Sequence, residues 1–178
     1  MAERIAASID AGIDALGRAV SWLNLGVVGL TFGVVVMRYA FGEGSIAVQE
    51  AVLWLHGTVF MLGASYALRH DAHVRVDLLY QRWSPQGRAR ADLAGTVFFL
   101  LPFCVFLAWI SADYVTSAWA VHEGSREAGG LPGVFVLKTL IPLAAVLLGV
   151  QGIAVALRKL ALLRGGAGDA AHGHPERL

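Results

Sequence analysis

Residues 131–157 read LPGVFVLKTLIPLAAVLLGVQGIAVAL, with Lys138 as the one charged side chain. A helix needs about 20 predominantly apolar residues to cross the hydrocarbon core of a bilayer. Residues 19–38, 46–68 and 93–119 are comparably long and apolar. Because lipid offers no partners for backbone amides and carbonyls, each stretch must pair these groups within a helix. The sequence therefore predicts an all-α integral membrane protein with four transmembrane helices.

The composition agrees with a chain whose solvent is lipid. Of 178 residues, 57% are hydrophobic and 15% are charged, whereas soluble domains carry about 25% charged residues. The chain has no long basic stretch interleaved with aromatic residues, which argues against nucleic acid as a partner. Cys104 is the one cysteine, so neither an internal disulfide nor a cysteine pair for a metal ion is expected. We expect membrane lipids as partners and no cofactor.

The chain divides into three parts. We predict an amphipathic N-terminal segment over residues 1–18, a four-helix membrane domain over residues 19–160, and a flexible tail over residues 161–178. An apolar stripe over residues 3–20 has helical spacing and consists of Ile5, Ile9, Ile13, Leu16 and Val20. Such a segment either lies flat in the headgroup region or extends the first span into the cytoplasm.

The positive charges predict the orientation of the chain. Cytoplasmic segments of membrane proteins carry an excess of Lys and Arg. Of the 14 Lys and Arg residues, eleven lie in the N-terminal segment, the loop between the second and third spans, and the C-terminal segment. The other three are Arg38, Arg126 and Lys138. We therefore expect both termini and the middle loop in the cytoplasm, and the other two loops on the outer side.

Asp113 and Lys138 lie within the last two spans, where an isolated charge is costly. Asp113 precedes the outer end of its span by about as much as Lys138 follows the outer start of the next, so the rise per residue places both at similar depth. We predict that they form an ion pair. Alternatively, the Lys138 side chain extends toward the outer headgroups.

Two further groups of residues are candidates for structure and assembly. Arg38 and Glu50 lie near the outer interface on consecutive spans, where a contact between them would tie the spans together. Contact with another subunit and a direct role in transport are the alternatives. Small residues let membrane helices approach closely, and the candidates for such packing are Gly26, Gly29, Gly33, Gly63, Gly149 and Gly152.

The order of several short motifs resembles one known family. These are Arg38-Tyr39, QEAVLW at 49–54, LGASYA at 62–67, HVRVDLL at 73–79, EGSRE at 123–127, GLP at 130–132 and Ile141-Pro142. Together they resemble the small permease subunit of tripartite ATP-independent periplasmic (TRAP) transporters, the DctQ-like family. The resemblance covers residues 18–160.

The resemblance implies a complex in the bacterial inner membrane. The sequence itself contains no nucleophile-and-base pair, phosphate loop or metal-ligand set, so we expect no enzymatic activity. In such a complex, a periplasmic binding protein captures an organic anion, often a carboxylate, and docks transiently. A large permease subunit carries the substrate and uses an ion gradient, usually of sodium. The small subunit is expected to be a fixed scaffold beside it. Residues at the matching motif positions are expected to serve structure and assembly, and these are Arg38, Glu50, His73, Asp77, Glu127 and Pro132.

Two other functions compete with this one. A membrane redox subunit would hold haem, for which His56 lies at mid-membrane, but such a site needs a second histidine at similar depth. The histidines His70, His73 and His122 all lie at or beyond span ends. A self-sufficient small transporter acting as a homo-oligomer is the other alternative, and it would need substrate-binding groups inside the spans.

Overall fold

The computed structural model of the chain describes residues 2–72 and 83–171, and all its regular elements there are helices. They are α1 (Ala2–Ser21), α2 (Leu23–Ala40), α3 (Ile46–Arg69), α5 (Pro85–Gly95), the π-helical segment η1 (Thr96–Leu100), α6 (Leu101–Ala120) and α7 (Val134–Ala171). Four helical units within the described part are long and apolar enough to cross a membrane. The predicted fold class is confirmed.

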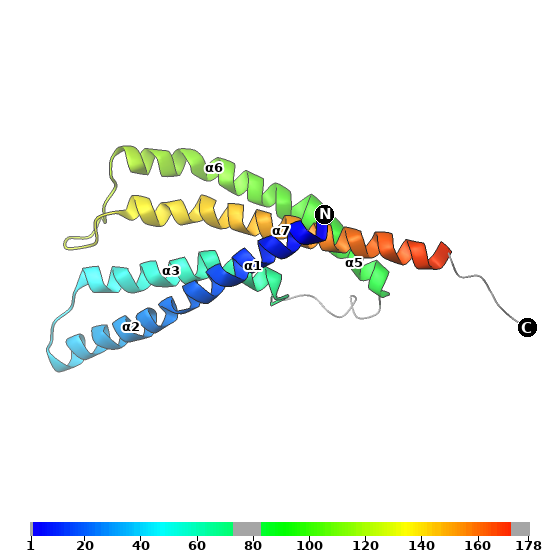
Figure 1. The fold of residues 1–178 in the computed structure, drawn as a ribbon. Coiled ribbons are helices and arrows are strands. Elements are labelled where there is room, and N and C mark those ends of the chain that lie inside the picture. The colour runs from blue at the N-terminus through cyan, green and yellow to red at the C-terminus, as the bar shows by residue number, and fades with distance from the viewer. Residues whose placement is uncertain (1, 73–82, 172–178) are drawn as a thin grey trace, which may run out of the picture.

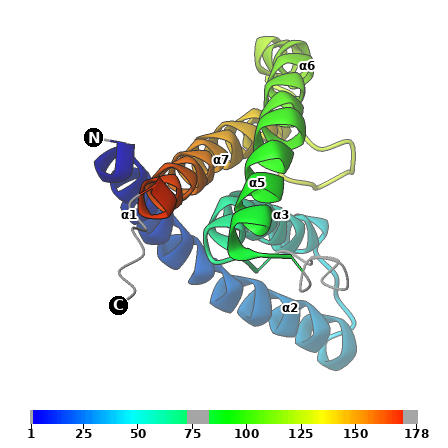
Figure 2. The same cartoon turned by 90° about the vertical axis from the view of Figure 1, so that its right-hand side faces the viewer.

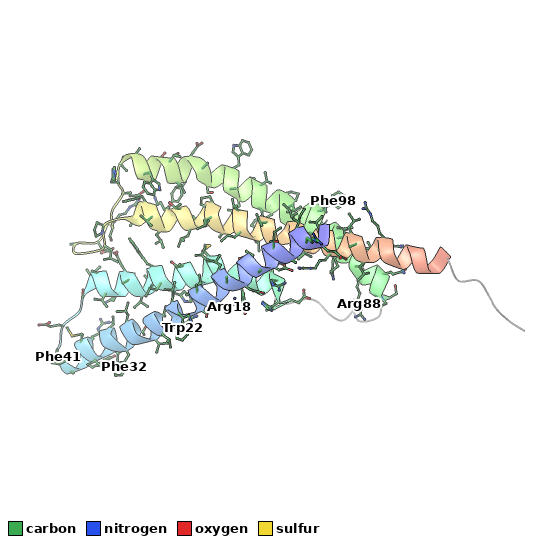
Figure 3. All side chains as sticks on the ribbon, in the orientation of Figure 1. Arg18, Trp22, Phe32, Phe41, Arg88 and Phe98 are labelled. Atoms are coloured by element: carbon green, nitrogen blue, oxygen red, sulfur yellow. The ribbon has the colours of Figure 1, made fainter. Side chains whose placement is uncertain are left out.

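The four spans form two hairpins that meet along α3 and α7. One hairpin pairs α2 with α3, the other pairs α6 with α7, and α3 packs against α7 (Figure 1). Seen from the end of the bundle, α2 and α6 lie on opposite sides of this central pair (Figure 2). Helix α2 has no buried residue at all. Phe32 of α2 and the aromatic residues that flank its ends, Trp22 and Phe41, are exposed and point away from the bundle (Figure 3).

The N-terminal helix α1 runs on into α2 with only Trp22 between them, so it extends the first span, as one of the two alternatives predicted. It also packs along α3 and α7, which neither alternative included. Its buried positions are Ala6, Asp10, Ile13, Gly17 and Val20. The buried side of α1 is therefore rotated by part of a turn from the predicted apolar stripe, and Ile5 of that stripe is 47% exposed. Small side chains face the neighbouring helices because they permit close approach.

The third span is a continuous helical unit whose middle is widened by η1. The N–H of Leu101 donates to the carbonyl of Thr96, five residues earlier. The following residue, Pro102, has no N–H with which to bond the carbonyl four residues before it. The sequence predicts a distortion at this proline, and the structure places a π-helical turn immediately before it. Such turns add one residue to a helix.

The ends of the last span differ from the prediction. Gly133 has a φ of +106°, a value that only glycine adopts readily, and α7 therefore begins at Val134. Pro132 lies within the apolar stretch over residues 131–157 that predicts the fourth span, but it precedes the helix instead of lying in its first turn. At the other end α7 continues to Ala171, past the predicted end of the span. His73, Asp77 and residues 172–178 lie outside the described residues.

Candidate functional site

Glu50, in the second turn of α3, holds the loop between α6 and α7. Its carboxylate accepts a hydrogen bond from the hydroxyl of Ser125 and another from the backbone N–H of Leu131, at 2.6 Å. Carboxylates commonly bind such donors strongly because the bonds are charge-assisted. The predicted contact between Arg38 and Glu50 was wrong, since Glu50 faces the α6–α7 loop while Arg38 is exposed at the end of α2.

Lys138 reaches the same loop. Its Nζ lies 2.5 Å from Oε2 of Glu123 and 3.9 Å from the centroid of the Tyr114 ring. The predicted Asp113–Lys138 pair was wrong in its acidic partner. The prediction matched the depths of Asp113 and Lys138 along their helices but did not consider the directions in which the two side chains point. Each residue turns a helix by about 100°, and Tyr114, the residue after Asp113, is the one that contacts Lys138 of α7. The alternative, a side chain extended toward the outer end, describes the geometry better.

The loop over residues 121–133 is compact around Ser125. The Ser125 N–H donates to the carbonyl of Leu131 at 3.1 Å, and its hydroxyl accepts from the N–H of Glu127 at 3.1 Å. A Cβ on Gly130 would overlap the Ser125 side chain and lie 2.8 Å from Oε2 of Glu50. Arg126 and Glu127 are exposed at the tip. We call Glu50, Glu123, Ser125, Leu131 and Lys138 the loop cluster.

A second polar cluster binds α1 to the opposite end of the bundle. Asp10 is 7% exposed, and its Oδ1 accepts from Nε2 of the fully buried Gln151 at 3.0 Å. Its Oδ2 lies 2.7 Å from Nη1 of Arg69 and also accepts a hydrogen bond from Arg158. One carboxylate thus joins α1 to both α3 and α7. A buried carboxylate requires such partners, because an unpaired charge is costly to desolvate.

Ion pairs extend this cluster. Asp14 lies 2.8 Å from Nε of Arg69 and 2.9 Å from Nε2 of His70. Further along, Asp92 of α5 pairs with Lys159 of α7 at 2.6 Å. The α1 cluster consists of Asp10, Asp14, Arg69, His70, Gln151 and Arg158.

Sequence reasoning missed Asp10 because it was assigned to the polar side of an amphipathic helix. The signal that identifies it is the series of small residues at the same helical phase, Ala6 and Gly17. A Cβ on Gly17 would overlap the ring of Tyr66 in α3. The tight crossing of α1 over α3 therefore buries Asp10 as well.

Comparison with known proteins decides the family. The family model described as "Tripartite ATP-independent periplasmic transporters, DctQ component" matches residues 27–162, which is more than half of the chain. The chain belongs to the DctQ family. It is similar to the ectoine TRAP transporter small permease protein TeaB of Halomonas elongata, with 29% identity over 132 residues. That match covers 73% of this DctQ subunit and 66% of TeaB, so it spans slightly less than two thirds of the relative.

The predicted packing glycines of this DctQ subunit fall into two groups. A Cβ on Gly149 would lie 3.4 Å from Cβ of Cys104, and one on Gly152 would lie 3.0 Å from Leu100. These two glycines therefore face the third span, and Gly26 similarly approaches Leu55. Positions without a described neighbour within 4 Å of an added Cβ are Gly29, Gly33 and Gly63.

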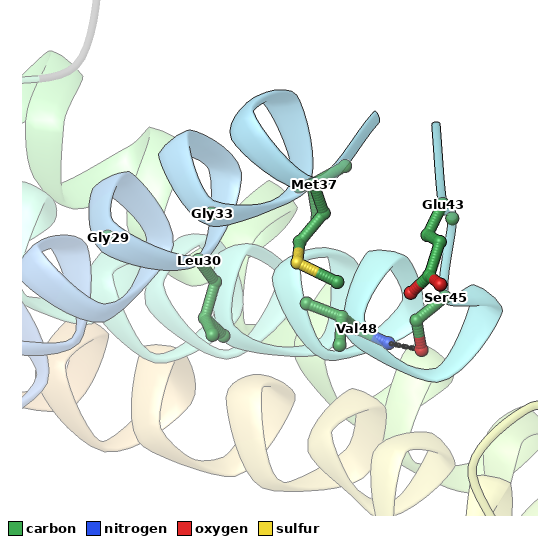
Figure 4. A pocket seen from close by; sticks show the side chains of 9 residues that line it. Gly29, Leu30, Gly33, Met37, Glu43, Ser45 and Val48 are labelled. Carbon is green, nitrogen blue, oxygen red and sulfur yellow. Dashed lines mark hydrogen bonds between the residues drawn. The ribbon is translucent and has the colours of Figure 1, made fainter. Parts of the chain in front are cut away.

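The cavities found among the described residues of this DctQ subunit are open, mainly apolar grooves of about 200 to 330 Å³. One groove of about 220 Å³ lies between the ends of α2 and α3 and is lined by Gly29, Leu30, Gly33 and Met37, with Glu43 at its rim (Figure 4). Within residues 2–72 and 83–171, no group of three or more His, Cys, Asp or Glu residues is placed to hold a metal ion.

The histidine considered for haem faces outward. His56 is exposed on α3, beside Leu53 and Phe60, which are 67% and 69% exposed. A haem held within the bundle would require this side chain to point inward, so the geometry does not favour the redox alternative.

Proposed function

We propose that this DctQ subunit is the fixed membrane scaffold of a TRAP transporter that imports an organic anion, such as a carboxylate. On this proposal a periplasmic binding protein delivers the solute, and a large permease subunit moves it with an ion gradient. The subunit itself has no enzymatic role. TeaB is named for ectoine, so membership of the family leaves the choice of solute to be measured.

The use of the polar side chains carries this proposal. Glu50 and Lys138 hold the α6–α7 loop, and Asp10 with Gln151 holds α1 to the bundle. These groups bind one helix or loop to another. Among them, Lys138 lines an apolar groove of about 330 Å³ beside Gly57 and Tyr114, but its ammonium group is paired with Glu123 of the loop. A solute site in a secondary transporter needs polar groups that converge on a cavity. Fixed contacts of this kind suit a rigid support.

We propose that the protein lies in the bacterial inner membrane with both termini in the cytoplasm. The α1 cluster then lies on the cytoplasmic side and the loop cluster on the periplasmic side. The distribution of Lys and Arg along the sequence supports this orientation, because eleven of 14 belong to the N-terminal segment, the loop between the second and third spans, and the C-terminal segment.

The loop over residues 121–133 is our candidate for docking the binding protein. It is held in one shape by the two hydrogen bonds to Glu50, and it presents the charged side chains of Arg126 and Glu127 to solvent. Exposed charges on a preorganised loop favour fast, reversible association with a charged partner. Glu50 acts here as a positioning residue.

Reconstitution in liposomes tests the scaffold proposal. Uptake of radiolabelled organic acids is measured under three conditions. The liposome experiment contains the small subunit alone, the large subunit and binding protein without the small subunit, or all three proteins. We expect accumulation only with all three. Accumulation by the small subunit alone would establish the self-sufficient transporter instead. A Soret band in the absorbance spectrum of the purified chain would establish the haem alternative.

The Glu50→Gln variant tests the docking loop in the same liposomes. Its weaker acceptor loosens the loop, so half-maximal uptake should require more binding protein, while the rate at saturating binding protein stays unchanged. The matched control is Gln49→Ala, which alters the exposed neighbour of Glu50. A fall in the saturating rate with no change in the half-maximal concentration would refute the positioning role.

A further inference from the structure

A groove with a basic rim lies where α1 passes into α2 beside α3. Its volume is about 200 Å³. Val59 and Gly63 of α3 line it together with Arg18 of α1 and Asn24 of α2, and the last two are exposed. A Cβ on Gly63 would have no neighbour within 4 Å, so the space over α3 is open there. The groove therefore combines an apolar wall with a cation.

The groove lies at the level of a membrane interface. Helix α2 begins at Leu23 and has 18 residues, so it rises about 27 Å, close to the hydrocarbon thickness of about 30 Å. Trp22, just before it, is 71% exposed and lies one turn from Arg18 (Figure 3), as expected of a tryptophan at the headgroups. Helix α3 agrees, because Arg69 at its end pairs with Asp14, one turn before Arg18.

Arg18 is a surplus cation at this interface. Among the described residues, no carboxylate forms an ion pair with its guanidinium group. Asp14, one turn earlier on the same helix, is engaged by Arg69 and His70. In the α1 cluster two aspartates balance two arginines, so the cluster has no excess negative charge to offer. An anion from outside the chain would compensate Arg18.

The donors beside the groove suit a phosphate group. A guanidinium group presents several N–H donors in one plane and binds phosphate through two of them at once. The hydroxyl of Ser21 donates to the carbonyl of Arg18 at 2.7 Å, so its proton is already used. The amide of Asn24 donates to the carbonyl of Ser21 at 3.1 Å, which leaves its second N–H for a ligand.

We propose that this groove binds an anionic phospholipid, with the phosphate at Arg18 and Asn24 and an acyl chain along Val59 and Gly63. Basic pockets between membrane helices on the cytoplasmic side bind acidic headgroups in this way. The apolar wall favours a lipid over free phosphate, because a small anion would leave that wall uncovered. The proposal rests on the orientation proposed above only for the choice of the cytoplasmic leaflet. The lipid would fill space beside α2, a helix that has no buried residue of its own.

Native mass spectrometry of the purified chain with added phospholipid tests the site. We expect the wild-type chain to bind phosphatidylglycerol more tightly than phosphatidylcholine with the same acyl chains. Arg18→Gln removes a charge-assisted contact, so it should weaken binding of phosphatidylglycerol about tenfold and remove the preference. The matched control is Arg4→Gln, which makes the same change of charge at an exposed residue near the start of α1 and should bind like wild type.

A second pair of variants tests the apolar wall. Gly63→Leu places a side chain in the open space of the groove and should also weaken binding of phosphatidylglycerol. Gly29→Leu has equally open surroundings on α2 but lines a different groove, so it should bind like wild type. Equal weakening by the two leucines would contradict a seat for the acyl chain at Gly63.

Melting of the same proteins separates binding from folding. In lipid-free detergent Arg18→Gln should melt like wild type, because the guanidinium group has no ion-pair partner among the described residues. Added phosphatidylglycerol should raise the melting temperature of wild type more than that of Arg18→Gln. Equal binding of phosphatidylglycerol by these two proteins would overturn the proposal, and so would full competition by inorganic phosphate. Since the isolated chain is used, such a failure leaves the transport function untouched.

Discussion

Replacement of Asp10 by alanine should detach α1 from the bundle. The substitution removes the acceptor of Gln151 Nε2 and the anionic partner of Arg69 and Arg158. Asp10 is 7% exposed and Gln151 is fully buried, so water cannot fully replace the lost contacts. Removing one partner from a buried ion pair costs about 3 to 5 kcal/mol. For a chain of this size, that corresponds to a fall in the melting temperature of about 6 to 20 °C.

The chain contains its own reporter for this experiment. Cys104 is the one cysteine and is buried between α6 and α7, so a thiol-reactive fluorophore labels it as the bundle opens on heating. Melting curves in detergent are compared for wild type, Asp10→Ala and Asp10→Asn, which retains the acceptor for Gln151 and should fall in between. Glu3→Ala, which changes an exposed acid of the same helix, is the control. A melting temperature for Asp10→Ala within the error of wild type would refute the role assigned to the cluster.

Two further predictions concern packing and charge. Gly17→Ala should lower the melting temperature, because the added methyl group overlaps the Tyr66 ring. Gly12→Ala has open space around the added methyl group and should stabilise the helix by about 1 kcal/mol through helix propensity. Equal changes in melting temperature for the two variants in the thiol assay would contradict the close crossing of α1 and α3. Lys138→Met should lower the melting temperature by leaving the Glu123 carboxylate without its cation, and adding Glu123→Gln should restore part of the loss. If the change in melting temperature of the double variant equals the sum of the changes in the two single variants, the two residues do not interact.

The hydrophobic pattern predicts most of the fold, because the lengths of the spans follow from bilayer thickness. Helix α3 begins at Ile46, as predicted, and ends one residue past the predicted boundary at Leu68. The start of α7 was placed too early, since apolar pattern alone does not reveal that Gly133 adopts a positive φ. Boundaries depend on local backbone chemistry that hydropathy does not report.

The polar contacts were harder to predict than the spans. Depth along the membrane is readable from residue counts, so Lys138 was correctly recognised as needing a partner. Rotation about the helix axis is not readable in the same way, and for that reason Asp113 was paired with it instead of Glu123. Glu50 was recognised as a tie between elements, but its partners are the Ser125 hydroxyl and the backbone N–H of Leu131 in the loop, and a backbone donor cannot be identified from a pattern of side chains.

The extra residue in η1 gives the third span an angular offset. Asp92, before η1, pairs with Lys159, and Cys104, after η1, packs on Gly149. Both halves of the third helical unit therefore contact α7. A uniform α-helix with the same number of residues would turn the first half by about 100° relative to the second and swing Asp92 away from Lys159. Conversion of this turn to a regular α-helix without loss of a residue therefore changes which groups meet α7, while deletion of one residue within the turn keeps both halves facing it.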